Sequence, residues 1–472
     1  MISQDNINLN NILIKEDINN YGIVYTPNNL VNKILDLIPI NYYRDPSLRW
    51  LDIGAGSGAF SINLYNRLFN ELSNNILDPN ERREHIIKNM LFMCEIYEPH
   101  INTLKTLFTN EANIISEDFI SLNKYNFEPF DFIIGNPPFN INGKLKTPTN
   151  NSIKKTDDGK QIYVEFVKKS LDLLYINGFL NIIIPSLWLK PDKAGLYNIL
   201  TTNKIHKLIA LSTTQTQKEF NYKAQTPTTY FLIEKSGQVP PSLLSNKILS
   251  KIPIYDKITN SYIEYDLSNN FPIPTHGINI INKLLFFLNK YGSLKVYKTN
   301  TCSKNTLIQE TYNHDFSYVN IKTCLLENNV EPKLTINYSN IAQQFYKEPK
   351  LIMAHKMYGF PFYDISGIYG ISARDNYIIL EKHYNNEKLK LIQAFLSTKT
   401  ALFIFSTTNY RMRYLERYAF EFIPNITKIP NFPNLINISR EKKDKLLFLF
   451  FNFSQKEQES IENYSKNYNF FI

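Results

Sequence analysis

Cysteine is scarce in this chain of 472 residues. Its three cysteines, Cys94, Cys302 and Cys324, stand far apart, without a CxxC pair and without a histidine at metal-binding spacing. This pattern excludes a disulfide framework and gives no indication of a zinc site. We expect the unpaired thiols of an intracellular protein and no bound metal.

Long hydrophobic runs are also lacking. The sequence begins with the polar segment MISQDNINLN, and its longest apolar tract, residues 446–453, is far shorter than the ~20 residues that span a bilayer. Internal repeats and heptad runs are lacking as well. We therefore expect a soluble intracellular protein with no membrane association, and neither a solenoid nor a coiled coil.

Apolar material for buried cores is plentiful. Hydrophobic residues make up 43% of the chain, including 31 Tyr and 32 Phe. Since a chain of this length exceeds the size at which one core keeps growing, we expect at least two domains. A Gly/Pro/Ser-rich break at residues 236–241 (SGQVPP) places their boundary, with one domain at 1–240 and another at 241–472.

The net charge of +9 is unevenly distributed. Residues 1–240 hold 24 Lys and Arg against 24 Asp and Glu, whereas residues 241–472 hold 28 against 19. The positive excess therefore lies in the C-terminal half, as expected if that half binds a polyanion beside a neutral catalytic half. A basic surface that only serves solubility would give the same pattern, so the charge alone does not decide.

The first half alternates short apolar runs with helical stretches, which predicts a mostly parallel sheet covered by helices. The expected strands are residues 50–53, 91–97, 113–116, 131–134, 179–184, 208–212 and 229–234. Residues 143–160 are polar and aperiodic, which predicts a long mobile loop. Beyond residue 241 the alternation is lost, and we expect an α+β domain.

Three of the expected strands end in residues suited to a nucleotide-like ligand. LDIGAGSGAF, residues 51–60, is a strand that enters a glycine-rich turn, where Gly54, Gly56 and Gly58 allow a ligand close to the backbone. Glu95 ends the next strand and can bind two ribose hydroxyls. Asp118, with Phe119, ends the third and can meet an adenine ring. A tight turn without ligand and ordinary strand-end acids remain alternatives.

The decisive motif is DFIIGNPPFN, residues 131–140. Pro137 and Pro138 remove two backbone donors, so the turn presents carbonyl acceptors. The Asn136 side-chain oxygen and the Pro137 carbonyl can together hold the two hydrogens of an amino group and increase electron density on its nitrogen. Phe139 can stack on a base that has left the duplex. A rigid turn with a coincidental sequence is the alternative.

In this order the motifs resemble the gamma group of N6-adenine DNA methyltransferases, of the Eco57I-like and TaqI-like restriction-modification type. The family begins with a GxxYTP segment, here YGIVYTPNNLV at 21–31, and continues with the glycine loop, the acidic strand end, the DF pair, NPPF and a recognition domain. GFLNIIIPSLWLKP, residues 178–191, matches a later core motif. The resemblance covers residues 20–240 well and the rest loosely.

The resemblance implies an α/β fold with a Rossmann-like seven-stranded domain that depends on S-adenosylmethionine, followed by an α+β target-recognition domain. The residues it implies for the cofactor are Tyr25, Thr26 and Pro27 at the methionine end, Asp52 at the amino group, Gly54, Gly56 and Gly58 in the loop, Glu95 at the ribose, and Asp118 and Phe119 at adenine. It implies Asn136, Pro137, Pro138 and Phe139 as the catalytic residues.

The family also places an aromatic residue before the seventh strand to sandwich the flipped base. Phe220 and Tyr222 both qualify here, and we favour Tyr222. In the segments 351–379 and 407–424, the candidate DNA contacts are His355, Lys356, Arg374, Arg411 and Arg413, because arginine pairs with guanine edges and lysine with phosphates. Each of them could equally be a solvated basic residue.

The resemblance predicts direct methyl transfer to adenine N6 in double-stranded DNA, without a covalent intermediate or metal, by a monomer. The sequence holds no recognisable nuclease motif and no room for one before residue 21, so a separate cognate endonuclease stays open as a partner. An RNA adenine or protein glutamine methyltransferase, and a DNA-binding specificity factor with a vestigial catalytic domain, are the alternatives.

Overall fold

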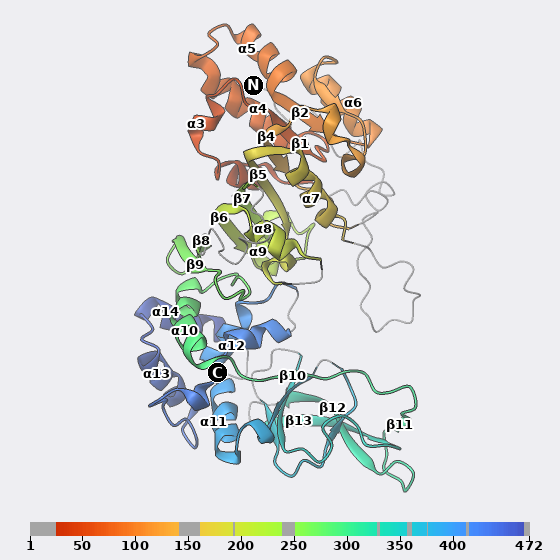
Figure 1. Cartoon of the computed structure of the whole chain (residues 1–472), viewed down its shortest axis with the longest axis vertical. Coiled ribbons are helices and arrows are strands. Elements are labelled where there is room, and N and C mark those ends of the chain that lie inside the picture. The colour runs from red at the N-terminus through yellow and green to blue at the C-terminus, as the bar shows by residue number, and fades with distance from the viewer. Residues whose placement is uncertain are drawn as a thin grey trace. The chain divides into compact units, whose positions relative to one another are not determined.

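The computed structural model describes residues 25–140, 161–191, 194–237, 251–327, 331–355, 361–374, 376–411 and 415–466 (Figure 1). The loop predicted at 143–160 lies outside the described residues. By their contacts, the described residues form two compact units. The first comprises the chain up to Tyr255 together with Asp266–Asn270, and the second comprises Asp256–Tyr265 and Phe271 onward.

The first unit is built on a sheet with the strand order β3-β2-β1-β4-β5-β7-β6-β8. Its strands are β1 (Trp50–Ile53), β2 (Leu91–Cys94), β3 (Asn113–Ile115), β4 (Phe130–Gly135), β5 (Leu174–Pro185), β6 (Lys204–Leu211), β7 (Thr228–Glu234) and β8 (Lys251–Asp256). The strand β9 (Ser261–Asp266) belongs to the second unit. Neighbours from β3 to β5 are parallel, and β7 is antiparallel to both β5 and β6. The order reverses between β1 and β4, and ligands of such sheets bind at the carboxyl ends of the strands at this point.

Aromatic side chains form a stack across the centre of this sheet. Trp50 of β1 lies opposite Phe132 of β4, with ring centroids 4.0 Å apart, and Phe132 lies 5.0 Å from Phe179 of β5. The buried faces of two helices, α2 (Asn28–Leu35) and α4 (Ala59–Glu71), belong to the same hydrophobic core. The helices α3 (Ile40–Tyr43), α5 (Pro79–His85), α6 (Glu98–Phe108), α7 (Tyr163–Leu173), α8 (Leu196–Thr201) and α9 (Thr213–Glu219) complete this unit.

All seven predicted strands are present in a mostly parallel α/β sheet, and β8 extends this sheet. Several strand ends differ from the prediction, and hydrogen bonds explain two of these differences. The strand expected at 91–97 stops at Cys94, because the backbone amides of Ile96 and Tyr97 donate to the Glu95 carboxylate and turn the chain. The strand expected at 208–212 stops at Leu211, because Ser212 instead caps α9 through a reciprocal pair of hydrogen bonds with Gln215.

The second unit is α+β, as predicted. One four-stranded sheet has the order β10-β17-β14-β15 and another has the order β11-β13-β12-β16. The elements are α10 (Ile278–Tyr291), β10 (Tyr297–Lys298), β11 (Ile308–Gln309), β12 (Tyr318–Glu327), β13 (Glu331–Ser339), β14 (Lys350–Ala354), β15 (Phe362–Asp364), β16 (Gly370–Ile371), β17 (Asn376–Leu380), α11 (Asn386–Leu396), α12 (Lys399–Ser406), α13 (Arg440–Phe450) and α14 (Gln455–Ser465).

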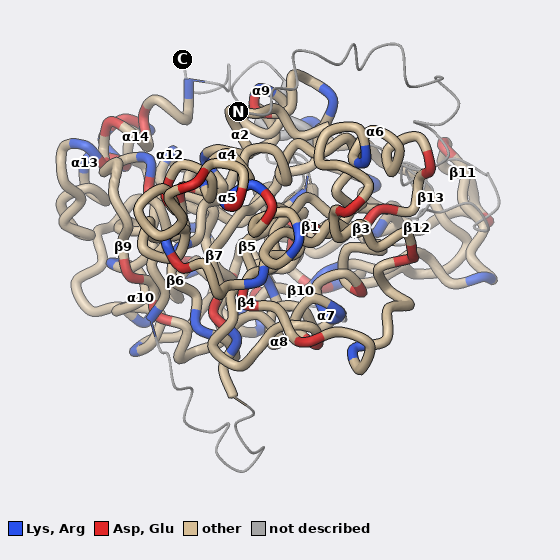
Figure 2. Tube along the Cα trace, turned by 90° about the horizontal axis from the view of Figure 1, so that it is seen from above, with Lys and Arg blue, Asp and Glu red and all other residues tan. Residues whose placement is uncertain are grey.

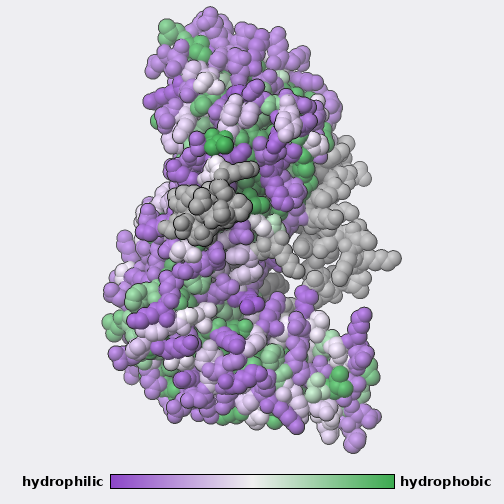
Figure 3. All heavy atoms as spheres, in the orientation of Figure 1, coloured by the Kyte–Doolittle hydropathy of each residue, from purple (hydrophilic) through white to green (hydrophobic). Residues whose placement is uncertain are grey.

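Charged residues are mixed in sign in both units. Figure 2 shows Lys and Arg interspersed with Asp and Glu along the trace, and the face in Figure 3 is mostly hydrophilic, with small separate hydrophobic areas. Within the described part of the chain, no single helix has the length and apolar character to cross a membrane, and only α11 and α12 together, bent by 70°, meet that test.

Candidate active site

The glycine loop connects β1 to α4 at the point where the strand order reverses. Gly54, Gly56 and Gly58 all have positive φ angles, of 64°, 57° and 93°, and Gly58 is the N-cap residue of α4. A Cβ atom added at Gly56 would meet no atom within 4 Å, so packing does not require this glycine. The loop therefore leaves open space beside its backbone, as the sequence analysis expected for a ligand.

Asp52 lies buried near the end of β1, beneath this loop. Its Oδ2 accepts a hydrogen bond of 2.6 Å from the Ser61 hydroxyl, whereas its Oδ1 is buried without a hydrogen-bond partner. Burial raises the pKa of Asp52 from its ordinary value of 3.8 to about 7, with Glu95 adding to the rise and Ser61 opposing it. The site thus holds a carboxylate whose second oxygen is free to accept.

Replacing Asp52 by asparagine is expected to change how stability depends on pH. Between pH 4 and 7 Asp52 keeps its proton in the folded protein and has lost it in the unfolded chain. The free energy of unfolding therefore falls as the pH rises through this range, and this decrease is complete above pH 7. Asp52→Asn should not show this decrease in unfolding free energy. The thermal midpoint of the variant should therefore rise relative to that of the wild type between pH 4 and 7.

The control for that experiment is Ser61→Ala. The Ser61 hydroxyl lowers the pKa of Asp52. Its removal should therefore keep the decrease in unfolding free energy with pH and extend it to higher pH. If wild type and Asp52→Asn change in parallel over the whole range, Asp52 is not the titrating group.

Glu95 follows β2 and receives three backbone hydrogen bonds. Its Oε2 accepts from the Gly56 amide at 2.6 Å, and its Oε1 accepts from the amides of Ile96 and Tyr97 at 2.9 Å each. Burial would raise the pKa of Glu95, but His100 and these amides hold it below its ordinary value. The carboxylate is therefore ionised and fixed against the glycine loop.

His100, a residue that the sequence analysis missed, connects Glu95 to the N-terminal segment. It is 2% exposed, its Nδ1 lies 3.7 Å from Glu95 Oε2, and its Nε2 lies 3.2 Å from the Tyr25 hydroxyl. Burial raises the pKa of Tyr25 to about 12, with Tyr97 and Glu95 adding to the rise, so Tyr25 stays protonated and can donate to His100. The signal in the sequence was weak: a histidine five positions after Glu95.

Asp118 and Phe119 follow β3. Asp118 is exposed and its Oδ1 caps a short 3₁₀ helix by accepting from the Ile120 amide at 3.2 Å. Phe119 is buried and stacks on Phe166 of α7. The thiol of Cys94, the last residue of β2, is buried, and its pKa is raised by burial and by the charges of Glu95, Asp118 and Asp52. The carboxyl ends of β1, β2 and β3 therefore form one acidic crevice.

The NPPF turn begins at Gly135, the last residue of β4. Gly135 has a φ of 140°, and a Cβ atom there would lie 2.8 Å from the Ile53 carbonyl oxygen and 3.2 Å from Asp52 Oδ1. Only glycine lets the turn approach β1 and Asp52 this closely. The close packing of β4 on β1 thus places the turn beside the acidic crevice.

The amide of Asn136 is half satisfied. Its Nδ2 donates to the Thr26 hydroxyl at 3.0 Å, whereas its Oδ1 is buried without a partner. Pro137 is buried, and Phe139 is half-buried, with its ring 6.5 Å from that of Tyr163 in an edge arrangement. A buried, unpaired acceptor is unfavourable unless a ligand supplies the donor.

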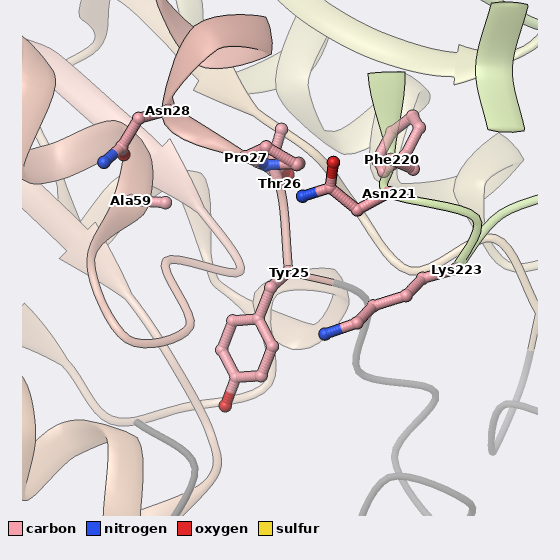
Figure 4. Close-up of a pocket in the computed structure, with 8 residues that line it drawn as sticks. All are labelled: Tyr25, Thr26, Pro27, Asn28, Ala59, Phe220, Asn221 and Lys223. Carbon is pink, nitrogen blue, oxygen red and sulfur yellow. The ribbon is translucent and has the colours of Figure 1, made fainter. Parts of the chain in front are cut away.

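A pocket of about 150 Å³ is lined in part by Thr26, the residue that accepts from Asn136 Nδ2 (Figure 4). Its lining residues come from the N-terminal segment, the start of α4 and the loop after α9: Tyr25, Thr26, Pro27, Asn28, Ala59, Phe220, Asn221 and Lys223. Phe220 is fully buried in the core, whereas Tyr222 is 72% exposed with a φ of 64°. Of the two aromatic candidates, Tyr222 thus has the accessible ring.

The candidates in the second unit do not form a described cluster. Arg374 lies between β16 and β17, and Arg411 follows α12. Both are exposed, and Arg411 Nε lies 3.7 Å from Glu416. His355 directly follows β14. Lys356 and Arg413 lie outside the described residues. Among the described residues, no group of three or more His, Cys, Asp and Glu is arranged to hold a metal ion.

The strand order with an antiparallel β7, the glycine loop and the acidic crevice define a Rossmann-like methyltransferase domain. Residues 17–216 match the model of the Eco57I restriction-modification methylase family. The family resemblance seen in the sequence is confirmed.

Curated relatives match part of the chain. The type II restriction enzyme and methyltransferase RM.BcgI of Heyndrickxia coagulans is 29% identical over 42% of this chain and 29% of its own length. The type II methyltransferase M.BstVI of Geobacillus stearothermophilus is 30% identical over 34% of this chain and 33% of its own length. The chain spans about a third of the length of these relatives.

Solved structures with similar folds include the type IIG restriction endonuclease BpuSI. The match has 12% sequence identity and a TM-score of 0.42, and it covers 93% of this chain and 65% of that chain. The M protein of the type I restriction enzyme EcoKI has 17% identity over 49% of this chain and 48% of that chain, with a TM-score of 0.36.

Proposed function

We propose that this chain transfers the methyl group of S-adenosylmethionine to the N6 amino group of a flipped adenine at a specific site in double-stranded DNA. The observation that carries the proposal is the buried, unpaired Oδ1 of Asn136 in the NPPF turn. An acceptor in this position requires a donor from the substrate, and an exocyclic amino group supplies two.

The chemistry of the turn suits a weak nucleophile. The lone pair of the adenine amino group is delocalised into the ring, so the nitrogen reacts only if electron density returns to it. Asn136 Oδ1 and the Pro137 carbonyl would each accept one N6 hydrogen, and Pro138 has no N–H to compete for that carbonyl. Both acceptors gain strength as positive charge develops on the nitrogen.

The residues around the glycine loop fit the proposed cofactor. When bound, S-adenosylmethionine supplies an electrophilic methyl group on a positively charged sulfonium. The unpaired Oδ1 of Asp52 can accept from its ammonium group, and the ionised Glu95 can accept from its ribose hydroxyls. Tyr25, Thr26 and Pro27 would contact the methionine end, and Asp118 and Phe119 the adenine. The open space beside Gly56 leaves room for the ligand.

The remaining elements of the proposal concern DNA. Phe139 and the exposed Tyr222 would hold the flipped base between their rings, which offsets part of the few kcal/mol needed to unstack it. We propose 1–240 as the catalytic domain and 241–472 as the domain that recognises the target sequence, with Arg374 and Arg411 as candidate contacts. A monomer working beside a separate endonuclease belongs to the same proposal.

The test is a methyl-transfer assay with isotopically labelled cofactor. The protein is incubated with duplex DNA, single-stranded DNA, RNA or a release factor, and each product is digested and identified by mass spectrometry. We expect N6-methyladenine in duplex DNA, at one sequence context. Methylglutamine in the release factor, or methyladenine in RNA alone, would replace the proposal with one of the alternative enzymes, and no product with any substrate would favour the vestigial domain.

A further inference from the structure

The side-chain amide of Asn136 can lie in two orientations, and these have opposite chemistry. An acceptor oxygen suits an amino group that donates, whereas the donors of Nδ2 would oppose it. In the structure Nδ2 donates to the Thr26 hydroxyl at 3.0 Å, and Oδ1 is the unpaired atom. This hydrogen bond therefore leaves Oδ1 as the atom available to the substrate.

The residues before and after Thr26 in the chain hold it in place. It is 7% exposed, and it stands between two anchored residues. The Tyr25 hydroxyl contacts His100 Nε2 at 3.2 Å, and the Pro27 carbonyl accepts from the amides of Leu30 and Val31 in the first turn of α2. Because Leu30 and Val31 are fully buried in the core, the position of the Thr26 hydroxyl is fixed by the fold.

We infer that Thr26 is a positioning residue, whose hydroxyl accepts from Asn136 Nδ2 and so holds Asn136 Oδ1 ready for the target amino group. This role is additional to the cofactor contact that the family resemblance assigns to Thr26, and it rests on the proposed function because it presupposes an amino-group substrate. The Thr26 hydroxyl acts on the orientation of one amide, so its loss should lower turnover even when the cofactor is saturating.

The experiment compares Thr26→Val, which keeps the shape but removes the acceptor, with Thr26→Ser, which keeps the acceptor. We expect Thr26→Val to lower kcat about 5- to 10-fold at saturating S-adenosylmethionine, the effect of one neutral hydrogen bond. Thr26→Ser should restore most of the turnover. In an Asn136→Ala background, Thr26→Val should produce no further loss, because the amide that it orients is gone.

Thr103→Val is the matched control. Thr103 is a similarly buried threonine on α6, and its hydroxyl donates to the Pro99 carbonyl. The Thr103→Val variant should change the stability of the fold and leave turnover unchanged. A Thr26→Val protein with weakened cofactor binding and normal kcat, or with a loss that persists in the Asn136→Ala background, would overturn the inference.

A second readout separates this inference from the proposed function. With ¹⁵N-labelled asparagine, the Asn136 side-chain signal is identified as the one absent from Asn136→Ala, and the hydrogen exchange of its amide protons is measured without substrate. Exchange should be slow in the wild type and in Thr26→Ser, and faster in Thr26→Val. Equal exchange in all three would refute the positioning role, whatever the enzyme methylates. Absence of adenine methylation by the wild type would refute only the proposed function.

Discussion

Alanine at position 136 is expected to lower the rate of methyl transfer by about 10²–10³-fold, the usual effect of removing one preorganised polar group that stabilises developing charge. The substitution removes Oδ1, the buried acceptor without a partner, and leaves Asp52 and Glu95 in place. Cofactor affinity should therefore remain close to that of the wild type. The measurements are single-turnover transfer with labelled cofactor and calorimetric titration of S-adenosylmethionine.

Asn102→Ala provides the control for this prediction. Asn102 is an exposed asparagine on α6, outside the NPPF turn. It should leave both the rate and the affinity near their wild-type values. Because Asn136→Ala also removes the hydrogen bond to Thr26, a loss of about 1 kcal/mol in unfolding free energy is expected and should be checked by thermal unfolding. Substantial transfer by folded Asn136→Ala would refute the role of Oδ1 as an acceptor.

Alanine at position 56 is expected to weaken cofactor binding by about 10- to 100-fold, because its methyl group would enter the space that the loop keeps open, and overfilling a well-packed site costs about 1–3 kcal/mol. The Gly56 amide that donates to Glu95 is retained in this variant. The affinity is measured by titration with S-adenosylmethionine and with its demethylated product.

Gly195→Ala is a close match for that variant. Gly195 begins α8 with a φ of 75°, compared with 57° at Gly56, and a Cβ at either position meets no atom within 4 Å. Both variants therefore carry the strain of a left-handed alanine, about 1–2 kcal/mol, so their loss of stability should be similar. The two should differ only in cofactor affinity. Equal affinities would show that the cofactor does not approach Gly56.

The central sheet could be predicted from sequence because its strands are short apolar runs and its loop is marked by glycine. Trp50–Ile53 is buried along its whole length, and Gly54, Gly56 and Gly58 follow at once. The need for glycine at position 135 could not be predicted, because it depends on the register that pairs Ile53 with Gly135 across two parallel strands. Sequence spacing does not contain that register.

The motifs of the candidate site could be predicted from the sequence, but the contacts between its side chains could not. His100 and Tyr25 are 75 positions apart, and only the fold brings them together. Phe220 and Tyr222 look equivalent in sequence, yet one completes the core and the other lies at the surface, because the turn after α9 takes positive φ angles at two successive residues. Which candidate arginines of residues 241–472 contact DNA remains a prediction.

The acidic surroundings of Cys94 have a chemical consequence if the proposed alkylating cofactor is the one that binds. A thiolate is the form of cysteine that attacks electrophilic carbon, whereas the neutral thiol does so poorly. Burial and the charges of Glu95, Asp118 and Asp52 keep the Cys94 sulfur in the neutral form. If S-adenosylmethionine binds in this crevice, the same carboxylates that attract its positive charge protect the enzyme from methylating its own cysteine.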